Sequence, residues 1–189
     1  MGCGKSTVGA ALAKRGFRRL DSDQIVRARV LPRVDVQAAL VARFGAVVLD
    51  KRGGQAARID RVVLAERIFG SDEDLAWVEK LLHPLVFEEW RRAWSTDPKA
   101  RWAVEVPLLF EKELENLFYF TLCVACSPEE QLVRLEQRGL PRGLASQRIS
   151  KQLPLPWKIE RADFVLWNEG LPAFLEAQID RLVERLDSF

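Results

Sequence analysis

Met1-Gly-Cys-Gly-Lys-Ser-Thr7 is the stretch from which the fold of this 189-residue chain is inferred. Gly4, Lys5 and Ser6 match the last three positions of G-x-x-x-x-G-K-[ST], a loop that holds phosphate groups at a helix N-terminus. The leading glycine of that pattern would lie five residues before Gly4, upstream of residue 1. Hydrophobic residues at helical spacing continue to Gly16, which predicts a helix directly after the loop. A chance Gly-Lys-Ser tripeptide is the alternative.

Each residue of this loop has an expected role in holding a nucleoside triphosphate. Glycines allow the backbone to approach phosphate closely, and their N–H groups then bind it. Lys5 is expected to contact the β- and γ-phosphates, and the Ser6 hydroxyl to ligate Mg²⁺. Cys3 is expected to be sensitive to oxidation, without a catalytic role. The predicted nucleotide-binding residues of the loop are Gly2, Cys3, Gly4, Lys5, Ser6 and Thr7.

Composition excludes several classes of protein. The net charge is +2, with 48% hydrophobic and 30% charged residues, which gives no reason to expect a nucleic-acid or membrane partner. No apolar run approaches the roughly 18 residues of a membrane-spanning helix, and the N-terminal residues lack the apolar core of a signal peptide. We therefore expect a cytoplasmic protein. The sequence does not fix the oligomeric state, and a monomer or a small homo-oligomer is expected.

The three cysteines and the single histidine are too few for a disulfide framework or a zinc cluster. Cys123 and Cys126 have the C-x-x-C spacing of redox proteins. Cys123, however, lies in an apolar run typical of a strand, where side chains three positions apart point to opposite faces. A structural role is favoured over a redox role for this pair.

Predicted strands and helices alternate along the chain. Apolar runs predict strands at 17–20, 101–106, 119–125 and 163–167, and Pro32 interrupts a helical region at 24–44. Such alternation predicts an α/β fold with a mainly parallel sheet and helices on both faces. Together with the phosphate-binding loop it indicates a fold of the P-loop NTP hydrolase type. The ligand site is expected at the carboxyl ends of the strands. Residues 1–189 are expected to form one domain, with a loop at 45–55. The other predicted helices lie at 4–15, 59–69, 73–95, 127–139, 143–153, 156–161 and 171–186.

Two carboxylates follow the first predicted strand. Asp21 and Asp23 are two residues apart, so in an extended segment both side chains would project from the same face. Asp23 is the better candidate to orient or deprotonate an attacking hydroxyl. The alternative is a helix N-cap, because aspartate caps the following helix well.

Other charged residues also have two interpretations. Glu105 interrupts an apolar strand, where it would either support a magnesium ion indirectly or form a buried ion pair. Arg134 and Arg138 share a helix face, and Arg142 and Arg148 follow. These arginines would stabilise charge in phosphoryl transfer from a mobile lid, or form a solvated basic surface. The single histidine, His83, precedes Pro84 and would contact a substrate or mark a helix kink.

Over essentially its whole length the chain resembles the dephospho-coenzyme A kinase family. The resemblance rests on many short segments in the same order rather than on any one of them. The main segments are Gly2-Cys-Gly-Lys-Ser-Thr-Val8, Leu20-Asp-Ser-Asp-Gln-Ile25, Leu82-His-Pro-Leu85, Val106-Pro-Leu-Leu-Phe-Glu111 and Ala162-Asp-Phe-Val-Leu-Trp-Asn-Glu-Gly170.

The resemblance implies ATP-dependent phosphorylation of the ribose 3′-hydroxyl of dephospho-coenzyme A, the last step of coenzyme A synthesis, with Mg²⁺ as cofactor. It implies an inserted helical CoA-binding region at about 24–100 and a helical lid at about 138–152. By position, the implied catalytic residues are Asp23, Lys5 and Arg138. The implied ATP-binding residues outside the loop are Arg138, Arg148 and, on the adenine side, Asn168. Substrate contacts are implied for Asp23, His83 and Leu108, and magnesium contacts for Ser6 directly and Glu105 indirectly.

Departures from the family pattern leave alternatives open. Leu31-Pro-Arg33 replaces the family's proline-glycine turn, and the strand and leading glycines before the loop are not in this sequence. We expect Met1 to be an internal methionine of a longer protein, since without that strand its neighbours would lack backbone partners. One rival function is that of another small-molecule P-loop kinase. Another is a truncated, inactive nucleotide-binding relative.

Overall fold

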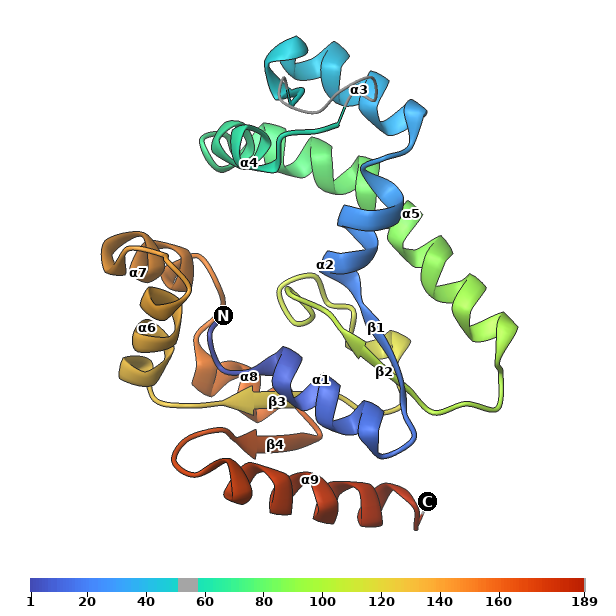
Figure 1. Ribbon diagram of the computed structural model, residues 1–189, viewed down its shortest axis with the longest axis vertical. Coiled ribbons are helices and arrows are strands. Elements are labelled where there is room, and N and C mark those ends of the chain that lie inside the picture. Colours follow the sequence, from blue (N-terminus) through green and yellow to red (C-terminus); the bar gives the residue numbers. More distant parts are fainter. Residues whose placement is uncertain (51–57, 189) are drawn as a thin grey trace. The chain divides into compact units, whose positions relative to one another are not determined.

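The computed structural model describes residues 1–50 and 58–188, so residues 51–55 of the expected loop at 45–55 lie outside the described residues. The chain divides into two compact units (Figure 1). The first consists of Met1–Arg19 and Arg101–Phe189, and the second is Leu20–Ala100. The second unit corresponds closely to the insertion expected at 24–100. Each unit is described separately.

The first unit begins with the loop and helix α1 (Lys5–Lys14). After α1 the chain enters β1 (Arg18–Asp21), which forms a two-stranded sheet with β2 (Trp102–Glu105). Strands β3 (Leu122–Ala125) and β4 (Phe164–Trp167) form a second, parallel two-stranded sheet, with Leu122 opposite Phe164 and Ala125 opposite Trp167. These elements confirm the predicted α/β class.

The strands of the described residues form two separate pairs rather than one continuous sheet. Among the described residues β1 pairs with β2 and β3 pairs with β4, and no described strand joins the two pairs. Ala103 of β2 and Val124 of β3 nevertheless pack against the same hydrophobic cluster. The interpretation that a strand precedes the loop stays a prediction.

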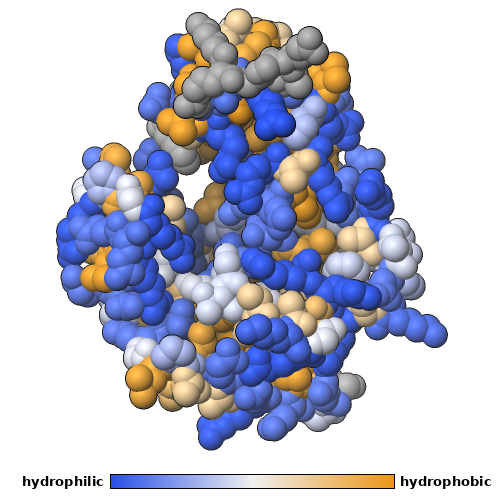
Figure 2. Space-filling model, in the orientation of Figure 1, coloured by the Kyte–Doolittle hydropathy of each residue, from blue (hydrophilic) through white to orange (hydrophobic). Residues whose placement is uncertain are grey.

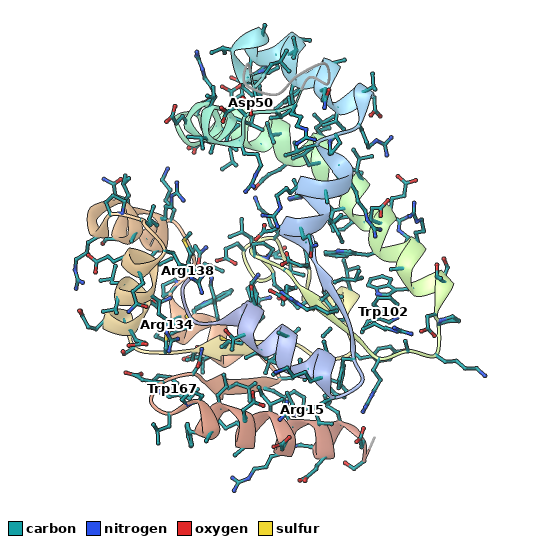
Figure 3. The ribbon with its side chains drawn as sticks, viewed as in Figure 1. Arg15, Asp50, Trp102, Arg134, Arg138 and Trp167 are labelled. Carbon is teal, nitrogen blue, oxygen red and sulfur yellow. The ribbon has the colours of Figure 1, made fainter. Side chains whose placement is uncertain are left out.

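One hydrophobic core joins these strands to α1 and to the closing helix α9 (Pro172–Leu186). The two helices lie side by side (Figure 1), and Arg15 of α1 bonds both Glu176 and Asp180 of α9 (Figure 3). The buried members of the core are Val8, Ala11, Leu12, Leu166, Leu175, Ile179 and Leu182. This core holds α1, and therefore the loop before it, against the strands.

Three more helices complete the first unit: α6 (Pro128–Gln137), α7 (Arg142–Ser150) and α8 (Leu155–Arg161). The Ser127 hydroxyl accepts a hydrogen bond from Glu130 N at 3.3 Å, and proline occupies the first turn of α6. The predicted N-terminus of this helix is confirmed. A short 3₁₀ turn, Glu115–Leu117, precedes β3.

The parallel pair β3–β4 is fastened at both ends by the same chemistry. At the amino end, the Thr121 N–H and hydroxyl both donate to Asp163 Oδ2 at 2.7 Å. At the carboxyl end, the Ser127 N–H and hydroxyl donate to the Glu169 carboxylate at 3.0 and 2.8 Å. These bonds favour the charged form, so the pKa of each carboxyl group is lowered. The β3–β4 strand pair is therefore well fixed, and so are the residues at its carboxyl end.

The second unit is helical. It contains α2 (Ser22–Ile25), a π-helical turn (Val26–Val30), α3 (Val34–Phe44), a 3₁₀ turn (Ala46–Val48), α4 (Arg61–Phe69) and α5 (Asp72–Thr96). Pro32 separates the π turn from α3, as predicted, and Pro84 lies inside α5. Buried side chains in this unit include Leu40, Val48, Val78 and Trp90.

Most expected strand boundaries agree with the structure to within one residue, but the start of β3 was predicted wrongly. β3 begins at Leu122 rather than at residue 119, because Tyr119 is fully exposed and its side chain does not pack on a core. Phe120 is 42% exposed, with its ring edge-on to that of Phe164. On the face drawn in Figure 2, hydrophilic residues predominate and hydrophobic residues occur in small groups. Within residues 1–50 and 58–188, no helix is long and apolar enough to cross a membrane.

Candidate active site

The loop before α1 has the backbone of an anion-binding turn. Gly2 and Gly4 adopt φ values of +79° and +96°, a region that favours glycine. Gly4 is the N-cap of α1, and no side chain of the described residues caps this helix. The N–H groups of its first turn can therefore receive an anion, whose charge the helix dipole favours.

Glu105 of β2 ties the functional side chains of the loop together. Its carboxylate is 4% exposed and accepts a hydrogen bond from Ser6 Oγ at 2.9 Å. Lys5 Nζ lies 3.6 Å from one carboxylate oxygen, and Arg19 Nε lies 2.5 Å from the other. The interpretation of Glu105 as a buried ion-pair partner is confirmed. Its indirect role at a magnesium ion stays a prediction.

Gly9 makes room for this carboxylate on α1. A Cβ atom at Gly9 would lie 2.4 Å from Glu105 Oε1 and 3.0 Å from Arg19 Nε. A larger residue would therefore displace the ion pair. Sequence reasoning missed both Gly9 and Arg19. Arg19 pairs with Glu105, 86 positions away in the sequence, and no local sequence pattern predicts that contact.

Three side chains from α6 and from the residue after β4 contact the backbone of the loop. Asn168 Nδ2 donates to the Cys3 carbonyl at 2.7 Å, and Gln131 Nε2 donates to the Met1 carbonyl at 2.6 Å. Arg134 Nη1 lies 3.5 Å from the Cys3 carbonyl and pairs with Glu130 at 2.8 Å. Of these, sequence reasoning assigned a site role to Asn168 and Arg134 but none to Gln131.

The expected lid arginines lie on exposed positions. Arg138 is the C-cap of α6, near Arg134 on the same helix (Figure 3), and Arg148 lies on α7. Arg142, at the start of α7, bonds Glu129 at 2.8 Å and Glu136 at 3.0 Å, both on α6. These carboxylates raise the pKa of Arg142. α7 is thus joined to α6 by exposed charges.

The cysteines behave as buried structural residues. Cys3, Cys123 and Cys126 are all free thiols and all buried. Burial raises the pKa of Cys123 to about 11, and burial together with Cys3 raises that of Cys126 to about 12. A thiol with a raised pKa is a weak nucleophile, because the thiolate is the reactive form. This supports the structural role expected for Cys123 and Cys126.

The two aspartates after β1 do not share an extended segment, and that expectation is wrong. Asp21 ends β1 and caps α2, its Oδ1 accepting a hydrogen bond from Gln24 N at 3.0 Å, so the chain turns into a helix at once. The N-cap interpretation is therefore confirmed for Asp21. Asp23 lies in the first turn of α2 and is exposed.

The two remaining candidates are both half-buried. His83 lies in the second unit, on α5, with its ring 6.1 Å from that of Phe87. Leu108 lies in the first unit, in the turn after β2. The first unit brings together Lys5, Ser6 and Glu105 with Asn168 at the loop, whereas Asp23 and His83 belong to the second unit.

Comparisons with known proteins agree on one family. A family model described as dephospho-CoA kinase matches residues 1–173. Two curated proteins named dephospho-CoA kinase, from Thermosynechococcus vestitus and Gloeobacter violaceus, are 38% and 36% identical to this chain. Their alignments cover 95% and 96% of this chain and 87% of each relative.

Two solved structures also match the chain over most of its length. The crystal structure of protein TT1252 from Thermus thermophilus matches with a TM-score of 0.83 and 33% identity, covering 98% of this chain and 93% of that one. A dephospho-CoA kinase from Campylobacter jejuni matches with a TM-score of 0.68 and 26% identity, covering 98% and 92%.

Proposed function

The chain belongs to the dephospho-CoA kinase family, and we propose that it transfers the γ-phosphoryl group of ATP to the 3′-hydroxyl of dephospho-CoA. The observation that carries this proposal is the glycine loop at the N-terminus of α1, with Lys5 and Ser6 both held by Glu105. The products are coenzyme A and ADP, so the reaction completes coenzyme A synthesis.

The loop supplies the electrostatic part of this reaction. Phosphoryl transfer depends mainly on positioning the reactants and stabilising charge on the transferred group. The N–H groups of the loop and of the first turn of α1 bind the phosphate oxygens, and Lys5 Nζ contacts the β- and γ-phosphates. Lys5 is 40% exposed, so its ammonium group can move from Glu105 to a phosphate.

A magnesium ion fits the donors present beside the loop. Ser6 offers a hydroxyl oxygen 2.9 Å from a buried carboxylate oxygen of Glu105, and Mg²⁺ prefers oxygen ligands. Among the described residues no group of three or more His, Cys, Asp or Glu side chains is placed to hold a metal. In kinases Mg²⁺ is usually bound by substrate phosphates and water, with one or two protein oxygens. Ser6 would ligate the ion and Glu105 would bind its water ligands. When bound, the ion neutralises charge on the phosphates.

Asp23 is proposed to act on the acceptor hydroxyl. Asp21 caps α2, and Asp23 is exposed in the first turn of the same helix. The 3′-oxygen forms a bond to the γ-phosphorus while the bond from that phosphorus to the β,γ-bridging oxygen breaks. The hydroxyl proton passes to the Asp23 carboxylate, and ADP leaves. Arg138 and Arg148 are proposed to stabilise charge on the transferred group, and His83 and Leu108 to contact dephospho-CoA.

A substrate panel tests the proposal. The purified chain is incubated with ATP, Mg²⁺ and one acceptor at a time, and ADP release and phosphorylated product are both measured. We expect turnover with dephospho-CoA and none with pantetheine, adenosine or nucleoside monophosphates. Equal or faster turnover of another acceptor would support the rival small-molecule kinase. ATP binding without product from any acceptor would support the inactive relative.

Asp23→Asn provides a second test within the same assay. The amide keeps the shape of the side chain but cannot accept the hydroxyl proton, so kcat should fall about a hundredfold. The Kd for ATP should change little, and Asp72→Asn in the first turn of α5 is the matched control. A wild-type kcat for Asp23→Asn would remove its assigned role. A cytoplasmic location and a monomer or small homo-oligomer stay predictions.

A further inference from the structure

The main chain of the phosphate-binding loop is held by two amide side chains. Gln131 Nε2 donates to the Met1 carbonyl at 2.6 Å and also contacts Cys3 Sγ at 3.1 Å. Asn168 Nδ2 donates to the Cys3 carbonyl at 2.7 Å. Gln131 is 7% exposed, so its amide is committed to the loop rather than to water.

Gln131 and Asn168 are both attached at the carboxyl end of the β3–β4 pair. Asn168 directly follows β4, and its N–H donates to the Ala125 carbonyl of β3 at 2.7 Å. Gln131 lies in the first turns of α6, and its N–H donates to the Ser127 carbonyl at 3.1 Å. Ser127 is in turn fixed to Glu169. The two donors are therefore attached to the same rigid frame.

The glycines of the loop fit these two donors closely. A Cβ atom at Gly4 would lie 2.0 Å from Asn168 Nδ2, and one at Gly2 would lie 2.9 Å from the Gln131 carbonyl oxygen. Both distances are shorter than any normal contact. Glycine at these positions is thus required by the approach of Asn168 and Gln131 as well as by the positive φ values.

Holding a carbonyl also fixes the N–H of the same peptide unit. The loop has no cis peptide bond, and neither does any other part of the chain that the structure describes. In a planar trans peptide the C=O and N–H point in opposite directions. The bond from Asn168 to the Cys3 carbonyl therefore directs the Gly4 N–H away from Asn168. The bond from Gln131 to the Met1 carbonyl likewise directs the Gly2 N–H away from the Gln131 amide.

We propose that Gln131 and Asn168 are positioning residues that orient the Gly2 and Gly4 N–H groups toward the polyphosphate of the nucleotide. The proposal rests on the proposed use of ATP, and it assigns Asn168 to the phosphate end of the nucleotide rather than to adenine. Without these donors the loop peptides can rotate, and the N–H groups no longer converge on phosphate. The effect should be the same for any ligand with a polyphosphate, whatever its base.

Inorganic tripolyphosphate, which has no base, is the probe that separates the two roles of Asn168. Its Kd is measured by calorimetry for the wild type, for Asn168→Ala and for Gln131→Met. Loss of one loop bond should weaken tripolyphosphate and ATP by a similar factor, about fivefold to tenfold. The KM for ATP and for GTP should rise by the same factor, while the KM for dephospho-CoA stays unchanged.

Gln178→Ala is the matched control. The Gln178 amide accepts a hydrogen bond from the Trp167 N–H at 2.9 Å and donates one to the Trp167 carbonyl at 2.8 Å. It therefore bonds the residue next to Asn168 in sequence rather than the loop. Its tripolyphosphate Kd should equal that of the wild type. An equal loss in Gln178→Ala would show that any damage to this end of β4 weakens binding, and would overturn the proposal. So would an unchanged tripolyphosphate Kd in Asn168→Ala with a weakened ATP Kd, since Asn168 would then act on the base.

The wild-type protein offers a test that needs no variant to fold. The amide resonances of Gly2 and Gly4 should shift on addition of tripolyphosphate. Unchanged resonances under saturation would contradict the proposal. Failure of the proposed function has a different signature, which is normal tripolyphosphate binding without any coenzyme A formed from dephospho-CoA.

Discussion

The phosphate-binding loop and helix α7 place their charged residues in opposite environments. At the loop, Lys5 and Ser6 meet a carboxylate that is 4% exposed, and two amide side chains hold the backbone. On α7, Arg142 is 48% exposed and bonds two exposed carboxylates. Exposed ion pairs contribute about 0–1 kcal/mol each, so they exchange partners at little cost. The loop is preorganised for a ligand, whereas α7 is held by contacts that can rearrange.

The largest effect is expected from Lys5→Ala, at the centre of the preorganised region. The variant loses the positive charge on the β- and γ-phosphates, so kcat/KM should fall by a factor of about 10² to 10³. Steady-state coenzyme A formation measures this change. Lys151→Ala, just after α7, is the matched control and should keep near-wild-type kcat/KM. Comparable losses in both variants would mean that the loop has no special electrostatic role.

Glu105→Ala tests whether the buried carboxylate organises the loop. Removing it leaves Arg19 and Lys5 without that partner, and breaking a buried pair is strongly destabilising. Because these cations are 31% and 40% exposed, we expect a loss of about 2–3 kcal/mol in the free energy of unfolding. Urea denaturation measures it. Glu129→Ala, which removes an exposed partner of Arg142, should lose less than about 1 kcal/mol. Equal losses of stability in the two variants would show that the buried Glu105 carboxylate contributes no more than an exposed one.

Arg148→Ala and Arg142→Ala separate two roles within α7. Arg148 is proposed to act on the transferred phosphoryl group, so its loss should lower kcat about tenfold or more. Arg142 bonds α6, and its loss should change kcat by less than about threefold while the thermal midpoint moves slightly. Pre-steady-state product formation distinguishes them. A larger kcat loss in Arg142→Ala would reverse the assignment.

The smallest effect is expected at the amino end of the β3–β4 pair, far along the strands from the loop. Thr121→Val removes the hydroxyl that donates to Asp163, and we expect the free energy of unfolding to fall by about 1 kcal/mol. Because folding lowers the pKa of Asp163, that stability is present above the ordinary aspartate pKa of about 3.9 and is lost as the pH falls below it.

Urea denaturation at several pH values between about 2 and 7 checks this prediction. The variant should show a flatter rise of stability with pH than the wild type. Ser95→Ala is the control, since its hydroxyl donates to the Arg92 carbonyl in the same helix rather than to a carboxylate. A pH profile identical to that of the wild type would show that Thr121 does not set the pKa of Asp163.

Local signals in the sequence predicted most of the elements. The break at Pro32 and the Ser127 N-cap were both identified, because each depends on residues within a few positions. The start of β3 was misplaced, since apolar residues such as Tyr119 do not reveal whether they pack on a core. For Asp21 and Asp23 the sequence allows both an extended segment and a helix N-cap, and the spacing alone does not show that the cap bond forms and begins α2.

The candidate site was only partly predictable. Lys5, Ser6 and Glu105 stood out because a motif and a charge in an apolar strand are local features. Arg19 and Gln131 did not, because their partners Glu105 and Met1 lie 86 and 130 positions away. Asn168 was identified through resemblance, which gave it a site role but not its bond to the Cys3 carbonyl. Long-range contacts of this kind depend on the whole fold.

Transfer of a labelled phosphoryl group tests the central claim most directly. ATP carrying ³²P in the γ-phosphate is incubated with the wild-type chain, Mg²⁺ and dephospho-CoA, and the products are separated. We predict that the label enters the 3′-phosphate of coenzyme A, with one ADP formed for each coenzyme A. Label released only as inorganic phosphate, or retained in ATP while the loop binds tripolyphosphate normally, would contradict the assignment of this chain as a kinase of dephospho-CoA.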